Sequence, residues 1–437
     1  MNIIVIDCGA SFFKTAVFED GMLLDSEVLE TPIDNAADCK KLTTLLNMIR
    51  MSIAKFADDK KEVVLAICNE MHGFVLADKN METCSGYISW QREFDDLSMS
   101  ILSSCKFRDD IEHTGMPLKK GLPSTNLSYV LKKMQKNFCN NWYFYTLGDY
   151  IIKALSGLDP VCHETNAAAT GLYDIKNHTW NRKLINAVAA DKVIFPSVGM
   201  SCVEFVLNGT RIIALPAIGD QQAALLGAGL ENDTDISFNL GTGAQVSRLV
   251  AEPCFSKSYQ IRPYIEGKYI KSIPHLPSGR AVNVYFRFVR EIAEKFGKVS
   301  DNEKIWQWIM EQMDSCSDAN LQCDLSFFAN PISSRTSGSI SNIGEYGFTV
   351  GNLFSSVMLQ MSKNYLWAAK IISSDMPDVK RVIFSGGIAR HMNLIRNVVM
   401  SDFAAEVEVV IGNNETLYGL MKYAMLHKED LFNYEKG

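Results

Sequence analysis

Asp220 is the residue of this chain whose type and setting suit it best to acid–base chemistry. It follows the apolar segment 212–218 and Gly219, and it precedes a run of small and apolar residues, 221–229, that predicts a helix. A carboxylate at the end of a strand can accept a proton from a hydroxyl that attacks a phosphoryl group, a reaction that otherwise needs positioning and charge neutralisation. Asp is also a preferred helix N-cap, so a purely structural role is the alternative.

A glycine turn that follows the apolar segment 2–7 carries a second acidic residue. Asp7 ends this segment and could hold a Mg²⁺ ion, directly or through water. Gly9 lets the backbone approach a phosphate closely, and successive N–H groups in such a turn make an anion site. Ser11 lies in the turn and Lys14 on the strand after it. Asp-x-Gly is also common in ordinary hairpins, so the turn alone does not identify a phosphate site.

A similar turn appears in the second half of the chain. Asn239 and Gly241 stand 232 positions after Asp7 and Gly9, and each pair follows an apolar strand. The turn itself is Gly241-Thr242-Gly243, which offers two glycines and a hydroxyl. An offset near half of the 437 residues is what a duplicated domain would produce, although two hairpins can also look alike by chance.

A third glycine turn, Gly386-Gly387, follows the apolar strand 381–384. Apolar residues then recur at the spacing of one helix, at Ile388, Met392, Ile395, Val399 and Phe403. Such a turn could bring backbone against a flat ring or a ribose. It could equally be a tight turn that simply needs glycine.

Residues suited to a polyol lie between the first turn and Asp220. Met71 and His72 follow the apolar strand 63–67, and Trp90 with Gln91 offers a stacking face beside an amide. The alternatives are a packed or surface histidine and an ordinary buried tryptophan.

Length and composition set the broad class of this protein. A chain of 437 residues predicts two domains, and alternating strands and helices predict an α/β architecture. The net charge of −7 gives no footprint for nucleic acid, and no apolar stretch is long enough to span a membrane. The chain begins with an apolar run without a cationic region, which predicts a strand rather than a signal peptide, and its eleven cysteines lack paired spacing. We therefore expect a cytoplasmic protein.

Taken in order, these segments resemble the FGGY family of carbohydrate kinases over essentially the whole chain. The matching segments are residues 7–11, 166–174, 219–224, 239–244 and 385–390. The resemblance implies an actin-like ATPase fold of two ribonuclease-H-like domains, here 1–231 and 232–437, with a nucleotide cleft between them. It also implies a protein that binds a small-molecule sugar and ATP, and we expect a monomer or a homodimer.

The resemblance assigns roles to the residues introduced above. Asp220 would be the catalytic base that takes the proton of a sugar hydroxyl as it attacks the γ-phosphate of ATP, and Asp7 would hold Mg²⁺. The substrate-binding residues would be Met71, His72, Trp90, Gln91, Asp220 and Gln221. The cofactor-binding residues would be Gly9, Ser11, Lys14, Gly241, Thr242, Gly243, Gly386, Gly387 and Asn393.

Two segments bear on the substrate. Residues 71–73 resemble the segment that meets the sugar in ketose kinases such as xylulokinase, whereas glycerol kinases carry an Arg-Glu pair in that region. Residues 90–91 and 263–279 are similar to the sedoheptulokinase branch. We therefore expect a ketose of the sedoheptulose, xylulose or ribulose class, with glycerol or another polyol as the alternative.

The chain also departs from the pattern of the family. Ala10 stands where a hydroxyl residue is usual, and Glu70 stands where ketose kinases tend to have Gln. A non-catalytic sugar or nucleotide sensor with the same fold is the alternative of another class. Retention of both Asp7 and Asp220 favours an enzyme, because a binding module has less need of a base and a metal carboxylate together.

Overall fold

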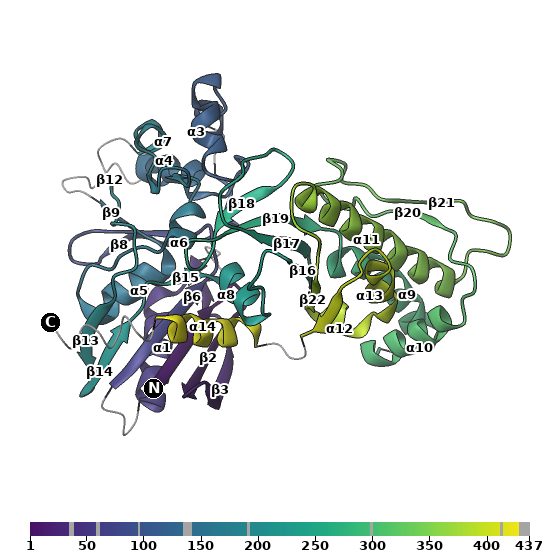
Figure 1. Ribbon diagram of the computed structural model, residues 1–437, viewed down its shortest axis with the longest axis horizontal. Coiled ribbons are helices and arrows are strands. Elements are labelled where there is room, and N and C mark those ends of the chain that lie inside the picture. Colours follow the sequence, from purple (N-terminus) through teal and green to yellow (C-terminus); the bar gives the residue numbers. More distant parts are fainter. Residues whose placement is uncertain are drawn as a thin grey trace. The chain divides into compact units, whose positions relative to one another are not determined.

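The structure is a computed structural model that describes residues 1–34, 39–57, 62–94, 97–133, 142–189, 193–297, 300–410 and 414–427. The chain forms two compact units (Figure 1). The first unit comprises Met1–Gly229, Ala251–Tyr269 and Asn414–Gly437, and the second comprises Leu230–Val250 and Ile270–Asn413. The sequence suggests a single division between residues 231 and 232. The first crossing lies within two residues of that position, but the chain then returns to the first unit twice.

The main sheet of the first unit has the strand order β13-β14-β6-β1-β2-β3, with β15 beside β6. The bounds are β1 Asn2–Cys8, β2 Phe12–Glu19, β3 Met22–Glu30, β6 Glu62–Asn69, β13 Val203–Leu207, β14 Thr210–Ala214 and β15 Ile218–Gly219. Strand β1 is antiparallel to β2 and parallel to β6. Both central strands are almost wholly buried, which explains their near-continuous apolar sequences. Helices α1 (Leu42–Phe56) and α5 (Leu147–Ser156) contribute to the hydrophobic core on this sheet.

The segment before Asp220 differs from its prediction. The expected strand 212–218 is two strands, β14 and β15, separated by residues 215–217. Pro216 lies in this break, and a proline has no N–H with which to continue a strand ladder. The following helix α8 spans Asp220–Gly227 instead of 221–229. The Pro216 carbonyl is not left unpaired, because it accepts a hydrogen bond of 3.0 Å from the Tyr423 hydroxyl.

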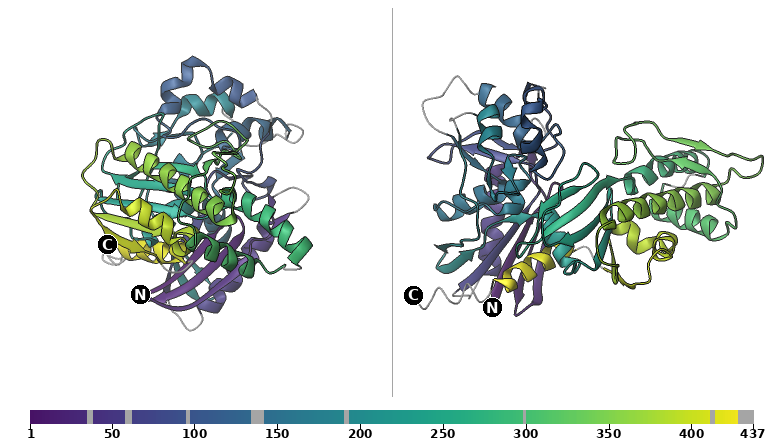
Figure 2. Two further views of the ribbon diagram at one scale, coloured as in Figure 1. Left: turned by 90° about the vertical axis from the view of Figure 1, so that its right-hand side faces the viewer. Right: turned by 45° about the horizontal axis from the view of Figure 1, so that its top comes forward.

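A second, smaller layer of the first unit surrounds a four-stranded sheet of order β12-β9-β7-β8. Its strands are β7 Phe74–Ala77, β8 Thr83–Ile88, β9 Trp142–Tyr145 and β12 Val193–Ile194. The helices of this region are α2 Leu97–Leu102, α3 Arg108–Glu112, α4 Pro123–Lys133, α6 Glu164–Ala168 and α7 Arg182–Val188. Helices α2, α4 and α7 contact one another, and both views of Figure 2 show this helical group at one end of the unit. The short pairs β4 Ile33–Asp34 with β5 Cys39–Lys40 and β10 Tyr173–Asp174 with β11 Thr179–Trp180 complete the layer.

The second unit repeats the strand pattern of the first. Its strands follow the order β19-β17-β16-β22-β23, with bounds β16 Asp235–Leu240, β17 Ala244–Val250, β19 Tyr269–Leu276, β22 Arg381–Ser385 and β23 Glu406–Val409. Strand β16 is antiparallel to β17 and parallel to β22, as β1 is to β2 and β6. The helices are α9 Gly279–Ile292, α10 Asn302–Asp314, α11 Val350–Ser373, α12 Gly387–His391 and α13 Asn393–Met400, and β20 Gln322–Asp324 pairs with β21 Ser339–Ser341. The repeat predicted from the 232-residue offset is therefore present in the fold.

The helix expected after Gly387 is broken in two. Helices α12 and α13 meet at Met392, whose backbone is not helical (φ −107°, ψ 83°). Arg396 explains how the break is tolerated, because its guanidinium donates to the Ala389 and Arg390 carbonyls at the end of α12. Phe403 lies beyond both helices, where its ring contacts Phe238. Across the described ranges, none of the helices combines the length and the apolar character that a bilayer crossing needs.

Candidate active site

Asp220 is the first residue of helix α8, and Gly219 is its N-cap. The N-cap role that the sequence allowed for Asp220 is therefore wrong, because Gly219 holds the extended backbone of the cap (φ −69°, ψ 145°). Asp220 Oδ1 accepts a hydrogen bond of 2.8 Å from the N–H of Gln221, and both side chains are half-buried. The positive end of the helix dipole favours the ionised form of a carboxylate at this position.

Buried side-chain amides hold the backbone that leads to Asp220. Asn166 Nδ2 donates to Asn69 Oδ1 at 3.0 Å and to the Ala217 carbonyl at 2.8 Å. The hydroxyl of Thr165 accepts a hydrogen bond of 3.1 Å from the N–H of Gly219. These contacts join the end of β6 to helix α6 and to the residue before Asp220, so the carboxylate starts from a fixed backbone.

Asp7 lies one strand away from the segment that carries Asp220. Asp7 and Ile218 are both in register with Cys68 of β6, on its two sides, so their Cα atoms are about 10 Å apart at normal strand spacing. Burial raises the pKa of the Cys68 thiol well above its usual value, and the nearby charges of Asp7 and Asp220 raise it further. The two carboxylates therefore flank the carboxyl end of one buried strand.

The Asp7 carboxylate has a hydroxyl and a lysine side chain as neighbours. Its Oδ2 accepts a hydrogen bond of 2.7 Å from the Thr416 hydroxyl and lies 4.0 Å from Lys14 Nζ, on the paired strand β2. Gly9 follows in the turn, where a Cβ would lie 2.9 Å from the Phe12 carbonyl oxygen. Ser11 is exposed in the same turn. The turn thus presents a buried carboxylate and a lysine beside exposed backbone.

Two glycines bring the helix of Thr416 against the helix of Asp220. Helix α14 spans Glu415–Leu426, and a Cβ on its Gly419 would lie 1.8 Å from the Ala223 carbonyl oxygen of α8. A Cβ on Gly227 of α8 would lie 1.7 Å from the Glu415 carbonyl oxygen. The two helices therefore cross with their backbones in contact. Sequence analysis did not single out Thr416, because nothing in its own segment indicates the Asp7 contact.

Met71 and His72 follow β6 and lie beside Asp220. A Cβ on Gly219 would meet Met71 Sδ at 2.7 Å, so the buried Met71 side chain lies against the helix cap. His72 has a left-handed backbone (φ 67°), and its Nδ1 lies 2.7 Å from the Ala169 carbonyl oxygen. A carbonyl only accepts, so Nδ1 carries a proton in this contact.

Glu70, which departs from the family pattern, is part of a buried pair. Burial raises the pKa of the Tyr87 hydroxyl well above its usual value, and the charge of Glu70 and a hydrogen bond to it raise it further. A Cβ on Gly73 would lie 2.0 Å from the Tyr87 hydroxyl oxygen, so only glycine leaves room for the tyrosine. The carboxyl group of Glu70 is therefore engaged by Tyr87.

Trp90 and Gln91 lie at the surface of the first unit. Trp90 is 41% exposed, which contradicts the reading of it as an ordinary buried residue, and Gln91 is exposed as well. Gly121 (φ 87°) comes so close that a Cβ would lie 2.2 Å from the Trp90 carbonyl oxygen. The loop that ends at Gly121 therefore packs against the backbone of Trp90.

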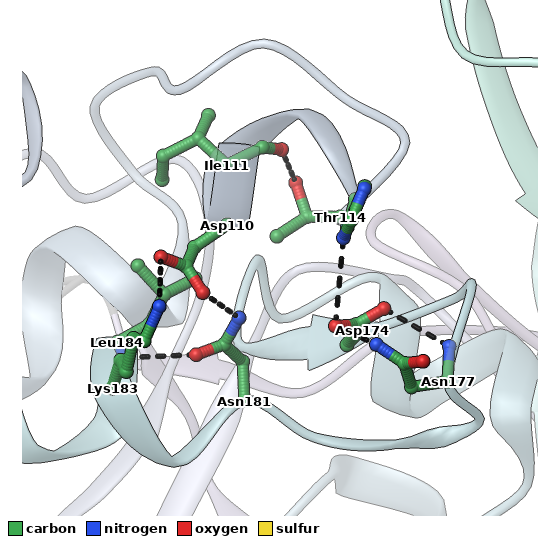
Figure 3. A network of polar contacts seen from close by, with 9 residues as sticks. Asp110, Ile111, Thr114, Asp174, Asn177, Asn181, Lys183 and Leu184 are labelled. Carbon is green, nitrogen blue, oxygen red and sulfur yellow. Dashed lines mark hydrogen bonds and ion pairs between the residues drawn. The ribbon is translucent and has the colours of Figure 1, made fainter. Parts of the chain in front are cut away.

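This loop starts from a polar network at the end of α3. Asp110 accepts from Asn181 Nδ2 at 3.0 Å and pairs with Lys183 at 3.4 Å, and Thr114 donates to the Ile111 carbonyl at 2.7 Å (Figure 3). His113 Nδ1 lies 3.7 Å from Asp174 Oδ2. The network fixes the start of the segment that carries Lys119.

Arg262 is a cation near Asp220, and Lys119 is a second cation beside Arg262; no local sequence pattern indicates either of them. Arg262 lies on strand β18 (Gln260–Pro263) and is only 3% exposed. Burial lowers the pKa of its guanidinium to about 10, while the charge of Asp220 raises it. Burial also lowers the pKa of Lys119 to about 8, and the charge of Arg262 lowers it further. The segment containing Arg262 belongs to the first unit only through a return of the chain, which no local pattern predicts.

The second glycine turn lies in the second unit, where the start of α9 holds it. The Gly241 carbonyl accepts from the Ser278 hydroxyl at 2.9 Å and from the Gly279 N–H at 3.1 Å, and the Thr242 carbonyl accepts from the Arg280 N–H at 2.8 Å. Thr242 and Gly243 are exposed at the tip. With its carbonyls turned toward α9, the loop is held in one conformation.

Gly386 and Asn393 also lie in the second unit. Gly386 has φ 87°, and a Cβ there would lie 2.6 Å from the Leu240 carbonyl oxygen, whereas a Cβ on Gly387 would meet nothing within 4 Å. Asn393 is exposed at the start of α13, and its Oδ1 accepts a hydrogen bond from Arg396. Gly386 therefore brings the turn at Gly386-Gly387 directly against the glycine turn that follows β16.

The first unit gathers most of the predicted chemistry around the end of β6: Asp7, Lys14, Met71, His72 and Asp220. A carboxylate at a helix start and a second carboxylate beside a lysine can activate a hydroxyl and hold a cation. Across the described ranges, no group of three or more His, Cys, Asp or Glu side chains could hold a metal ion by itself.

A family model described as "FGGY family of carbohydrate kinases, N-terminal domain" matches residues 2–227 of this chain. The match covers more than half of the chain, so the protein belongs to this family, as the ordered motifs indicated. Glycerol kinase of Clostridium perfringens (strain 13 / Type A) is 26% identical over 196 residues, which cover 41% of this chain and 39% of the glycerol kinase. The chain thus matches about two fifths of the length of that relative.

Solved structures resemble this chain over nearly its whole length. A xylulose kinase from Rhodospirillum rubrum has a TM-score of 0.82 at 14% identity and covers 97% of this chain and 90% of its own. A gluconate kinase from Lactobacillus acidophilus has a TM-score of 0.80 at 18% identity and covers 96% and 88%. At such identities the likeness shows the fold, which is the α/β, actin-like ATPase fold of two domains.

Proposed function

We propose that this protein is an ATP-dependent carbohydrate kinase that uses Asp220 as its general base. The observation that carries the proposal is that Asp7 and the segment leading to Asp220 lie on the two sides of the carboxyl end of β6, in a chain of the FGGY family. The hydroxyl oxygen of the sugar attacks the γ-phosphorus of ATP, the bond to the β-phosphate oxygen breaks, and ADP leaves. The hydroxyl proton goes to Asp220, which stands at the start of α8, where the positive end of the helix dipole favours an ionised carboxylate.

The residues present fit a magnesium ion held mainly by Asp7. Mg²⁺ is usually bound by one or two carboxylates together with phosphate oxygens and water, and Asp7 is one such carboxylate, oriented by Thr416. When bound, the ion would neutralise charge on the phosphates. Lys14 would add a second positive charge on the neighbouring strand.

The glycine turns are proposed to bind the nucleotide. Gly9 and Ser11 would offer backbone and hydroxyl donors to phosphate oxygens, and the turn Gly241-Thr242-Gly243 would do the same in the second unit. The turn at Gly386 and Gly387, with Asn393 nearby, would lie against the adenosine. Close packing of Gly386 on the Leu240 carbonyl supports a shared role for these two turns.

The acceptor is proposed to be an open-chain sugar, with a ketose as the expectation from residues 71–73. Met71 and His72 would contact its hydroxyls, as would Gln221, and the exposed face of Trp90 with Gln91 is suited to stacking and hydrogen bonding. Glycerol is the second candidate, and the partial likeness to glycerol kinases supports including it.

An acceptor panel tests this proposal. ADP release is measured with ATP and Mg²⁺ in the presence of pentuloses, hexuloses, sedoheptulose, sugar acids and glycerol. We expect weak ATP hydrolysis alone and strong stimulation by one class of acceptor. If none of the acceptors raises ADP release above background, the kinase proposal is wrong and a binding role takes its place.

A further inference from the structure

Arg262 is a buried arginine whose hydrogen-bonding capacity is only partly used. Its Nε and Nη2 donate to Gln260 Oε1 at 3.2 and 2.8 Å, and Nη2 lies 4.0 Å from Met116 Sδ. Its Nη1 is buried and has no hydrogen-bond partner in the part of the chain that the structure describes. A buried guanidinium donor without an acceptor is costly, so an acceptor supplied by a ligand would be bound favourably.

Lys119 places a second cation close to this arginine. The two side chains are near enough for the charge of Arg262 to lower the pKa of Lys119. Two neighbouring, partly desolvated cations repel each other. An anion between them would relieve the repulsion, whereas a neutral hydroxyl would supply one acceptor and no charge.

Both cations are attached to the framework that carries Asp220. The Gln222 side chain of α8 donates to the Pro263 carbonyl at 3.0 Å, which ties strand β18 to that helix. The N–H of Ile261 donates to the Gly115 carbonyl at 2.8 Å, which ties the same strand to the loop of Lys119. The charge of Asp220 also acts on Arg262. The two cations are therefore held in the neighbourhood of the proposed base.

We propose that Arg262 and Lys119 form a subsite for the carboxylate of an open-chain sugar acid whose hydroxyl is presented to Asp220. The inference rests on the proposed kinase function. It replaces the neutral ketose expected from residues 71–73 with a sugar acid as the acceptor. Asp220 acts on Arg262 by its charge, but it loses that charge when it takes the hydroxyl proton, whereas the carboxylate of the substrate stays charged.

The experiment compares matched acceptors and matched variants. Gluconate and 2-ketogluconate are compared with fructose, and xylonate with xylulose, by kcat/KM for ADP release. The variants are Arg262→Gln, Arg262→Lys and Lys119→Gln, with Lys120→Gln as the control at an exposed neighbouring lysine. The shift in melting temperature that gluconate causes without ATP is measured in parallel, because it reports binding independently of catalysis.

We expect an acid to be the best acceptor of the wild-type protein. Arg262→Gln should lower kcat/KM for that acid by about 10- to 100-fold, as for the loss of a charge-assisted hydrogen bond, and change that for neutral sugars by less than about 3-fold. Lys119→Gln should act in the same direction more weakly, and Arg262→Lys should retain part of the activity.

The subsite is refuted if a neutral ketose is preferred over every acid, or if Arg262→Gln reduces both classes equally. Should Arg262→Gln fail to fold, Lys119→Gln decides by the same criterion. Absence of phosphorylation with every acceptor would refute the proposed function, while a melting shift by gluconate that is lost in Lys119→Gln would still support the anion site. Absence of that shift in the wild-type protein would count against the anion site.

Discussion

The two glycine hairpins of this protein share a backbone plan and differ in charge. In the first, Asp7 pairs with Lys14 across the strands, and in the second Asn239 pairs with Gln245 at the corresponding place. The first strand of each hairpin also pairs in parallel with a buried strand: β1 with β6, and β16 with β22. The two turns therefore share one backbone plan, whereas charged residues are paired across the strands in the first hairpin and neutral residues in the second.

The neutral pair of Asn239 and Gln245 also differs from the charged pair in its hydrogen bonds. Gln245 Nε2 donates to the Ser247 hydroxyl at 2.7 Å within its own strand, whereas Asp7 accepts from Thr416, which lies 409 positions away in the chain. The second hairpin is thus stabilised locally, and the first is coupled to α14 and, through it, to the helix of Asp220. We therefore expect substitutions of charged residues in the first unit to affect turnover most.

The largest effect is expected at Asp220. Asp220→Asn should lower kcat at least ~100-fold, because it removes the proton acceptor, while the Kd for ATP changes little. Steady-state ADP release and equilibrium nucleotide titration measure the two quantities. Unchanged turnover would show that the carboxylate only stabilises the start of α8.

A reciprocal exchange tests the comparison of the hairpins directly. Asp7→Asn gives the first hairpin the residue type of the second and should lower Mg²⁺-dependent turnover by roughly 10- to 100-fold, because the proposed metal carboxylate is lost. Asn239→Asp should change turnover by less than about 3-fold. Magnesium titrations of both variants provide the readout. Equal losses in the two variants would contradict the assignment of the metal to the first unit.

One buried carboxylate in each unit should contribute to the free energy of unfolding with an opposite dependence on pH. Burial raises the pKa of Asp149 to about 6, and the neighbouring Thr146 and Cys162 side chains only partly counteract this rise. Because the folded state binds this proton more tightly than the unfolded state, the contribution of Asp149 to stability is fully present below about pH 3.8. It is lost as the pH rises through about 6. Asp149→Asn should therefore increase the free energy of unfolding at pH 7.5 by about 1–2 kcal/mol, and the gain should shrink toward pH 4.5.

Asp235 of the second unit is the matched control. Burial opposes its ionisation, but hydrogen bonds from Arg381 and neighbouring backbone lower its pKa below the usual value. This carboxylate stabilises the fold above about pH 3.8, and the contribution is lost as the pH falls through its lowered pKa. Asp235→Asn should therefore destabilise the protein at pH 7.5. Denaturant unfolding at several pH values tests both, and the same sign for both variants would contradict this account.

The smallest expected effect is a difference in stability between alanine substitutions at the first glycines of the two turns, Gly9 and Gly241. Gly9→Ala should destabilise the protein by about 1 kcal/mol, because its Cβ would press on the Phe12 carbonyl oxygen at 2.9 Å. A Cβ on Gly241 has no neighbour closer than 3.8 Å, so Gly241→Ala should stay within about 0.5 kcal/mol of the wild type. Thermal unfolding of the pair measures the difference. A larger loss for Gly241→Ala would reverse the comparison.

Local sequence patterns are sufficient to predict many strands and turns of the first unit and their repetition in the second. The strands around Asp7 and Asn239 were predicted because a buried apolar run ending in a glycine turn is a local signal. The same reasoning failed for residues 212–218, where Pro216 interrupts the strand, and for the helix after Gly387, which breaks at Met392. Helical spacing of apolar residues does not reveal this break, because the Arg396 side chain satisfies the carbonyls that the break leaves at the end of α12.

The family, the duplicated α/β plan and the two candidate carboxylates, Asp7 and Asp220, can be inferred from the sequence alone. The residues around these carboxylates are known only from the folded chain: Thr416 contacts Asp7, and Arg262, with Lys119 beside it, lies near Asp220. Burial periodicity and turn chemistry are properties of neighbouring residues, so a sequence displays them. Contacts between segments hundreds of positions apart depend on packing, such as the crossing of α8 and α14 at Gly227 and Gly419, and become visible only in the folded chain.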